Sequence, residues 1–226
     1  FPELKEAGFL LACSGGLDST VLAHLCHKAG LSFALAHVNY QLRGDESDAD
    51  AQFTTSLAQE MGAQYYTTSF DTPALKSREK GSLQEIAREL RYNWFKELLK
   101  KEDYDFLVTA HHKDDNMETF LIHILRGTGL NGLTGIPSKR DKIRRPLLAF
   151  SREEIHAFAT ENKLVWREDS SNESDDYLRN KVRHSLVPVF KEINPEILSA
   201  FETTQGHLLN SSILVDKVIQ TTIKQL

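Results

Sequence analysis

The residues with the clearest capacity for chemistry form one short run near the start of the chain, Ser14-Gly15-Gly16-Leu17-Asp18-Ser19-Thr20. Two adjacent glycines let the backbone turn tightly and approach a ligand without a Cβ clash. If a helix begins here, its free N–H groups and its dipole form an anion site, to which the hydroxyls add donors. A plain strand-to-helix turn with a Ser or Asp N-cap would use similar residues. The acidic and hydroxyl residues directly behind the glycines favour phosphate binding.

The same run excludes two common nucleotide motifs. It has no lysine, so it is not a Walker A loop, and the dinucleotide pattern G-x-G-x-x-G is absent. A carboxylate beside phosphates needs a cation between them. We therefore expect Asp18 to help hold Mg²⁺, which commonly bridges carboxylates and phosphates.

A second candidate group is acidic. Asp114 or Asp115 shares a helix face with Glu118, and such carboxylates could hold Mg²⁺, bind a cationic amine or accept its proton. Acidic residues also favour helix N-termini through the dipole alone. His111 and His112 could join Asp114 in a zinc site, but no Cys or third His lies nearby, so contact with a nucleotide or a base is favoured.

Arginines at helical spacing supply the opposite charge. Arg88 and Arg91 lie beside the apolar stripe of a predicted helix, where a surface position is the default. Arg179, Asn180 and Arg183 could bind phosphate groups of a nucleic acid or of a nucleotide, and a solvated helix face explains them equally well.

These residues must be positioned by the elements around them. Apolar runs at 9–13, 33–39, 64–68 and 106–110 predict buried parallel strands. Between and after them, helical patterns cover 17–29, 47–61, 82–101, 116–125, 151–161 and 176–190, the last ending at Pro188. The alternation predicts an α/β fold, a doubly wound and mainly parallel sheet of about five strands with helices on both faces, followed by a helical segment.

The end of the chain differs in character. An amphipathic pattern begins at 195, so we predict a catalytic domain at 1–194 and, at 195–226, a helical linker or the start of a C-terminal region missing from this chain. Its apolar face either packs back on the domain, or docks on a missing domain or on a second copy in a homodimer.

Composition narrows the class of protein. The 226 residues are 40% hydrophobic and 26% charged, which excludes a disordered chain, and no apolar run approaches a membrane span. Two cysteines suit a reducing cytoplasm. The net charge of −5 argues against nucleic acid as a partner, but the basic run at 139–145 opposes that average locally. A solvated charged turn is the alternative for that run.

The glycine run resembles the SGGxDS signature of the PP-loop, or N-type, ATP pyrophosphatases. Further segments resemble the tRNA(Ile)-lysidine synthetase family, in the order HVNYQLR (37–43), TAHHKDDNMET (109–119), LRGTG (125–129), GLTGI (132–136), RPLL (145–148), WREDSSN (166–172) and YLRNKVR (177–183). Tyr40 stands where that family often has His. The segments cover residues from about 10 to 190, and their joint order is far more specific than the loop alone.

The resemblance implies a reaction. ATP, with Mg²⁺, adenylates the wobble cytidine of the isoleucine tRNA that carries a CAU anticodon. Free L-lysine then attacks through its ε-amine, AMP leaves, and the base becomes lysidine.

The resemblance also assigns residues. It implies catalytic roles for Asp18, Arg91, Asp115 and Glu118, with Asp18 on the metal. It implies nucleotide contacts for Ser14, Gly15, Gly16, Leu17, Asp18, Ser19, His37, Asn39 and His111. It implies substrate contacts for Arg43, Arg88, His112, Asp114, Arg179, Asn180 and Arg183.

Rival functions differ in what they require. A PP-loop tRNA thiolase needs catalytic or iron–sulfur cysteines, and this chain offers only Cys13 and Cys26. A glutamine-dependent amidating synthetase needs a glutaminase domain, which is not visible. A nucleotide-binding module without chemistry would not need the acidic group at 114–118.

Overall fold

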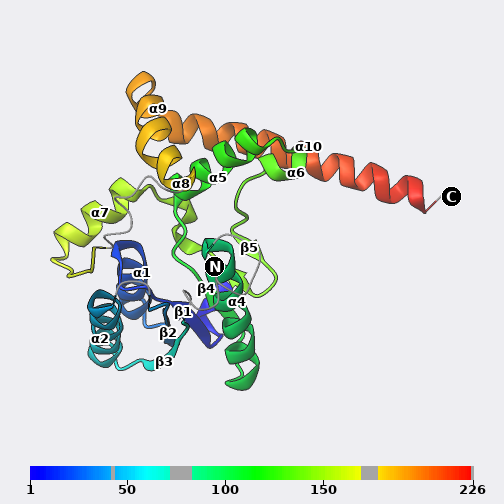
Figure 1. The fold of residues 1–226 in the computed structure, drawn as a ribbon. Helices are drawn as coiled ribbons and strands as arrows, with labels where there is room; N and C mark the ends of the chain where they lie inside the picture. Colours follow the sequence, from blue (N-terminus) through cyan, green and yellow to red (C-terminus); the bar gives the residue numbers. More distant parts are fainter. Residues whose placement is uncertain (42–43, 72–82, 169–177, 225–226) are drawn as a thin grey trace. The chain divides into compact units, whose positions relative to one another are not determined.

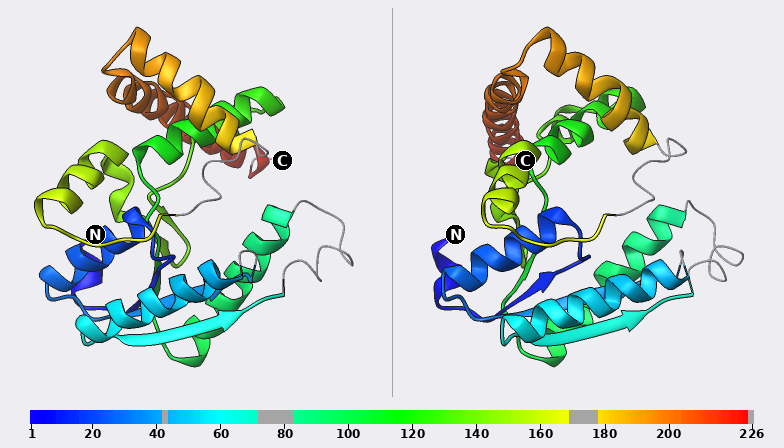
Figure 2. Two further views of the ribbon diagram at one scale, coloured as in Figure 1. Left: turned by 60° about the vertical axis from the view of Figure 1, so that its left-hand side comes forward. Right: turned by 90° about the vertical axis from the view of Figure 1, so that its left-hand side faces the viewer.

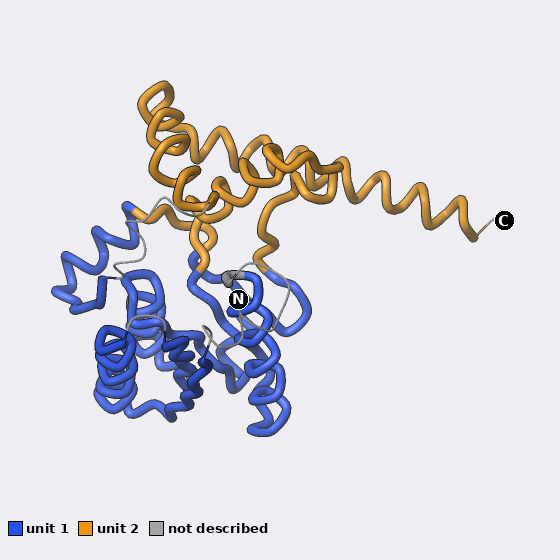
Figure 3. The backbone as a smooth tube through the Cα atoms, in the orientation of Figure 1, with its two compact units in different colours: residues 1–110, 139–147, 153–168 blue, residues 111–138, 148–152, 169–226 orange. Residues whose placement is uncertain are grey.

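The computed structural model describes residues 1–41, 44–71, 83–168 and 178–224. They form two compact units, each assembled from separate stretches of the chain (Figure 3). Unit 1 comprises the described parts of 1–110, 139–147 and 153–168; unit 2 comprises 111–138, 148–152 and the described parts of 169–226. The boundary expected near Asn194 divides the chain by sequence order and stays a prediction.

Unit 1 contains a six-stranded sheet in the order β3-β2-β1-β4-β6-β5. Its strands are β1 (Phe9–Ala12), β2 (Phe33–Asn39), β3 (Gln64–Ser69), β4 (Phe106–Val108), β5 (Lys139–Arg140) and β6 (Ile143–Arg144). Neighbouring strands are parallel except β5, which runs antiparallel to β6. At the centre, Leu11 lies opposite Leu35 on one side and Val108 on the other. Such apolar strands need cover on both faces.

Helices supply that cover (Figures 1 and 2). The helices of unit 1 are α1 (Leu17–Lys28), α2 (Asp45–Glu60), α4 (Leu83–Lys101) and α7 (Arg152–Glu161, from 153 onward), with short 3₁₀ turns η1 (Pro2–Lys5) and η2 (Pro146–Ala149). Side chains of α1, α2 and α7 pack with Leu11 and Leu35 in one core. Phe95 and Leu98 of α4 pack with Leu10 in a second core. Because successive strand residues point to opposite faces, the two cores lie on opposite sides of the sheet.

Unit 2 is helical. It contains α5 (Lys113–Arg126), α6 (Leu130–Leu133), α8 (Leu178–Lys181), the π-helical turn η4 (Val182–Leu186), α9 (Val187–Ile193) and α10 (Ile197–Ile223). The Phe120 and Phe201 rings meet edge to face at 5.0 Å, and the amides of Asn116 and Gln205 bond at 2.7 Å, so α10 packs on α5. Farther along α10, apolar residues such as Leu214 are exposed.

The expected α/β class is confirmed, with three local corrections. The described residues form six strands, because the basic run forms the β5–β6 hairpin and not only a charged turn. The helical structure does not end at Pro188, because proline is tolerated in the first turn of α9. Helix α5 begins before Asn116, at Lys113, because the His112 side chain caps it. Within the described ranges, no helix has the length and hydrophobicity to span a membrane.

Candidate functional site

Neighbouring residues donate hydrogen bonds to the backbone carbonyl groups of the turn that connects β1 to α1. The Cys13 carbonyl lies 2.9 Å from Nδ1 of His37. The Gly15 carbonyl accepts hydrogen bonds from the Thr20 hydroxyl at 3.2 Å and from the Arg167 backbone N–H at 2.9 Å. The first N–H groups of a helix have no carbonyl partner within it. The N-terminus of α1 therefore has the character of an anion site.

Hydroxyl groups reinforce this turn, which we call the glycine loop (residues 14–20). The Ser19 hydroxyl donates to the Gly16 carbonyl at 3.1 Å and accepts from the Ser14 N–H at 3.2 Å. The Ser14 hydroxyl is exposed, lies 3.2 Å from that of Ser19, and accepts from the Gly16 N–H at 3.3 Å. Hydrogen bonds within the loop thus hold both hydroxyls in place.

Gly15 is required by conformation as well as by space. Its φ is +88°, a value that L-residues with side chains rarely adopt. A Cβ there would lie 3.2 Å from the Phe53 ring and 3.4 Å from Thr54. Only glycine fits without displacing α2.

Asp18 lies half-buried in the first turn of α1, the turn that would face phosphate. Within the described ranges no group of three or more His, Cys, Asp or Glu residues could hold a metal alone. Mg²⁺ typically takes one or two carboxylates and completes its shell with phosphate oxygens and water. One carboxylate beside an anion site fits that pattern, and Asp18 as the ligand stays a prediction. The zinc alternative at 111–114 has no support.

His37 presents one nitrogen to the interior. A carbonyl can only accept, so Nδ1 carries the proton that bonds to Cys13, and Nε2 is left as an acceptor. Nε2 is buried and has no partner among the described residues. Burial lowers the pKa of His37 and keeps the ring neutral near pH 7. An N–H or O–H donor of a nucleotide would satisfy this atom.

Asn39 is engaged in the fold. Its side chain accepts from the Gln41 N–H at 2.8 Å and donates to Asp48 at 3.2 Å, which joins the end of β2 to α2. Its contact with nucleotide stays a prediction. Arg43 lies outside the described residues.

A cluster of arginines and tyrosines lies near the start of α4. The guanidinium carbons of Arg88 and Arg91 lie 4.8 and 5.5 Å from the centre of the Tyr92 ring. Arg145, which is buried, bonds to the side chain of Tyr92, and burial lowers its pKa. Burial raises the pKa of Tyr40, which faces the same arginines. The cluster concentrates positive charge on aromatic faces, an arrangement suited to phosphate and bases.

In unit 2, a capping box begins α5. The Asp115 N–H donates to Nδ1 of His112 at 3.2 Å, and the His112 N–H donates to Asp115 Oδ2 at 3.0 Å. Burial alone would raise the pKa of Asp115, but the electrostatic interactions with His112 and Arg179 outweigh it and hold the pKa below its ordinary value. Asp115 is therefore ionised at neutral pH. His111, directly before, is half-buried.

Glu118 is a buried carboxylate of this unit that pairs with two arginines. It is 2% exposed and accepts from Arg179 Nε at 3.0 Å and from Arg183 Nε and Nη2 at 2.6 and 3.1 Å. Arg183 also reaches Asp115 at 3.4 Å, and it lies in the π-helical turn η4. The structure thus brings together four predicted site residues, and buried Asn180 lies between the two arginines in sequence.

Asp114 has a separate set of partners. Its carboxylate accepts from Lys191 Nζ at 2.6 Å and from the Arg152 backbone N–H at 2.8 Å. Burial would raise its pKa, but these hydrogen bonds lower it below the ordinary value. An amine of this chain already occupies Asp114, and its substrate contact stays a prediction.

A model of the PP-loop domain matches residues 1–190 of the chain. The chain belongs to the PP-loop family. It is 39% identical over 96% of its length to a tRNA(Ile)-lysidine synthase from Bacteroides thetaiotaomicron, covering 51% of that protein. It is 43% identical over 81% of its length to a tRNA(Ile)-lysidine synthase from Chlorobaculum tepidum, covering 56% of it. The chain spans about half the length of these curated relatives.

Solved structures share the PP-loop fold at low identity. A U34-tRNA thiolase from Methanococcus maripaludis, solved with its [4Fe-4S] cluster, superposes with a TM-score of 0.74 at 19% identity, over 93% of this chain and 74% of that one. An NH₃-dependent NAD synthetase from Campylobacter jejuni gives 0.55 at 17%, over 100% of this chain and 90% of that one. These likenesses show the fold alone.

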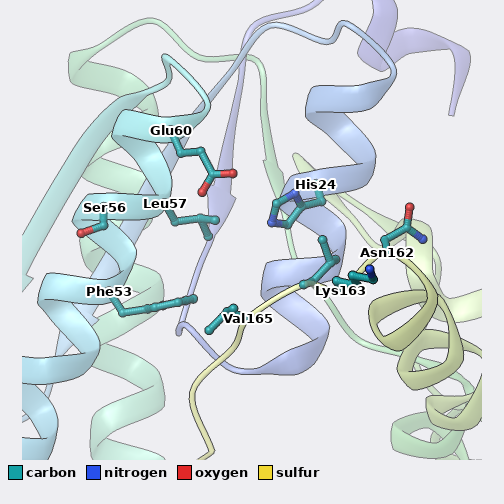
Figure 4. A pocket seen from close by; sticks show the side chains of 9 residues that line it. His24, Phe53, Ser56, Leu57, Glu60, Asn162, Lys163 and Val165 are labelled. Atoms are coloured by element: carbon teal, nitrogen blue, oxygen red, sulfur yellow. The ribbon is translucent and has the colours of Figure 1, made fainter.

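A cavity of about 270 Å³ lies between α1, α2 and the segment after α7 (Figure 4). Its polar lining residues are His24, Ser56, Glu60, Asn162 and Lys163. Phe53 also lines it, and the Phe53 ring lies 3.2 Å from the position that a Cβ would take on Gly15. Phe53 therefore lies between this cavity and the glycine loop.

Sequence reasoning missed three residues around the PP-loop and α4. They are Arg167, Asp50 and Tyr92. The Arg167 backbone N–H bonds to the Gly15 carbonyl, and its side chain forms an ion pair with Asp50. The Tyr92 ring packs against the guanidinium of Arg88 on α4. The only signal was position: Arg167 follows Trp166 within a segment typical of the family, and Tyr92 follows Arg91. Neither position carries a chemical pattern of its own.

Proposed function

We propose that this chain is the nucleotide-binding and catalytic part of an ATP-dependent tRNA(Ile)-lysidine synthase of the cytoplasm. The observation that carries the proposal is similarity to enzymes of that name over nearly the whole chain, unit 2 included. The fold by itself does not distinguish among enzyme functions, because a thiolase and an NAD synthetase share it.

In this proposal unit 1 handles the nucleotide. The PP-loop N–H groups and the hydroxyls of Ser14 and Ser19 bind phosphate oxygens, and Nε2 of His37 accepts a hydrogen bond from ATP. Asp18 holds Mg²⁺, which would neutralise phosphate charge. The cytidine carbonyl oxygen attacks the α-phosphorus and pyrophosphate leaves. Arg91 stabilises the negative charge that develops in this step.

Unit 2 recognises the amine. Asp115 is the more available carboxylate, because its side chain is 15% exposed and its contact with Arg183 is 3.4 Å long. Glu118 is fully engaged and instead fixes both arginines. An ionised Asp115 suits the ammonium of free L-lysine. The neutral ε-amine attacks the activated carbon, AMP leaves, and the proton lost from nitrogen passes to a nearby base.

The thiolase alternative conflicts with the cysteines of this chain. Its two cysteines are both buried in unit 1. Burial raises the pKa of Cys13 and raises that of Cys26 to about 12, so neither thiol ionises readily near pH 7. Two such thiols fit neither cluster ligation by four cysteines nor nucleophilic sulfur transfer.

The apolar face of α10 is consistent with the prediction that this helix docks on a C-terminal domain or on a second copy of the chain. Leu214, Val218 and Ile223 are exposed along one helix. Since the relatives are about twice as long as this chain, a C-terminal region or a second copy of the chain would bury this face.

The proposal is tested by incubating the full-length protein with ATP, labelled lysine and the isoleucine tRNA with a CAU anticodon. We expect label in the tRNA, with AMP and pyrophosphate released in equal amounts. The same tRNA with uridine at the wobble position is the matched control and should take up none. No incorporation into the cytidine tRNA, or equal incorporation into both, would overturn the proposal.

A further inference from the structure

Arg167 packs directly against the glycine loop (residues 14–20). Its backbone N–H bonds to the Gly15 carbonyl at 2.9 Å. Its Cγ lies 3.8 Å from the position that a Cβ would take on Gly15, and its carbonyl lies 3.9 Å from the same position on Gly16. The side-chain stem of Arg167 therefore lies against Gly15, and its backbone carbonyl lies near Gly16.

The guanidinium is held by one carboxylate. Arg167 Nε lies 3.0 Å from Oδ1 of Asp50 on α2. The Asp50 side chain is 11% exposed, whereas that of Arg167 is 39% exposed. The carboxylate is thus fixed in the fold, and the cation stands at the surface beside the loop.

The loop itself lacks a cation for the triphosphate. It contains no lysine, and its one charged side chain, Asp18, is negative. Hydrogen bonds and a helix dipole supply only partial charges, equivalent to roughly half a charge. Arginine binds phosphate with two parallel N–H bonds, and the phosphate chain carries more charge than one carboxylate.

We propose that Arg167 is a phosphate-binding residue of this PP-loop. Asp50 holds its guanidinium when no nucleotide is bound, and the guanidinium turns from Asp50 to the β- or γ-phosphate of ATP when nucleotide binds. The inference rests on the proposed function only in taking ATP as the ligand. It needs no tRNA chemistry.

Binding measurements on the full chain separate this role from a structural one. We would measure Kd for ATP and for AMP by calorimetry on Arg167→Gln, Arg167→Lys and Asp50→Asn. Lys163→Gln is the matched control, since it removes one positive charge from the same segment. A direct phosphate contact predicts about tenfold weaker ATP binding for Arg167→Gln, with AMP binding changed less than about threefold. Arg167→Lys should recover part of the loss, and Lys163→Gln should match the wild type.

Asp50→Asn gives the sharpest contrast. Freed from its partner, Arg167 should bind ATP as well as in the wild type or better. If the ion pair were merely structural, Asp50→Asn and Arg167→Gln would weaken ATP and AMP binding alike. That outcome, or unchanged ATP binding by Arg167→Gln, would overturn the inference.

The proposed function fails independently. A wild type that binds ATP through Arg167 but forms no lysidine would overturn the function and support this inference. Lysidine formation together with an ATP affinity that does not change in Arg167→Gln would support the proposed function and overturn this inference.

Discussion

Glu118 offers a quantitative test of how unit 2 is held together. Its buried carboxylate accepts three hydrogen bonds from Arg179 and Arg183, at 2.6–3.1 Å. Glu118→Gln keeps the shape of the side chain but removes its charge. Two guanidinium groups that had shared one anion would then face an amide, which can also present N–H donors to them. The junction between α5 and the α8–η4 segment should loosen.

The magnitude follows from the burial of the partners. Removing one member of a buried ion pair costs about 3–5 kcal/mol. The side chains of Arg179 and Arg183 are 36% and 21% exposed, so water recovers part of their solvation and the lower figure applies. We expect unfolding to become easier by about 3 kcal/mol, or a fall in Tm of roughly 6–12 °C for a chain of this size.

Urea unfolding followed by circular dichroism measures this change, and hydrogen exchange of the α5 amides locates it. Glu202→Gln is the matched control in the same unit. Its ion pair with Lys113, at 3.1 Å, is 59% exposed on the glutamate side and should contribute less than about 1 kcal/mol. Equal effects of the two substitutions would show that Glu118 is not a buried electrostatic anchor.

Three further changes test unit 1. Asp18→Asn should abolish tRNA-dependent release of AMP while leaving Tm within about 2 °C of wild type, because asparagine keeps the size and shape of this half-buried side chain; full activity would refute its role with Mg²⁺. Gly15→Ala should lower the unfolding free energy by about 1–3 kcal/mol, measured in urea, because φ is +88° and Phe53 lies 3.2 Å away; an unchanged midpoint would contradict the strain. Because burial lowers the folded-state pKa of His37, the unfolded chain takes up a proton first as pH falls below about 6.5, and stability declines from there until the folded-state pKa is passed. His37→Gln should flatten that decline in a series of urea midpoints, and parallel pH profiles would exclude the assignment.

Much of unit 1 was predictable because its signals are local. The apolar runs predicted the first four strands, and the glycine loop was placed correctly between β1 and α1. Burial of a continuous apolar run does not depend on which strand lies beside it. The β5–β6 hairpin escaped prediction because two-residue strands carry no periodicity.

The sequence by itself determined the glycine loop, the buried strands and the family, since each depends on residues adjacent in the chain or on motif order. Only the tertiary structure decided which charges meet. Glu118 and Arg183 are 65 residues apart and Asp50 and Arg167 are 117 apart. The carboxylates expected to stand ready for substrate are already paired, because packing of η4 and α9 on α5 brings Arg183 and Lys191 to them. Burial without a partner would cost each carboxylate far more than the pairing does.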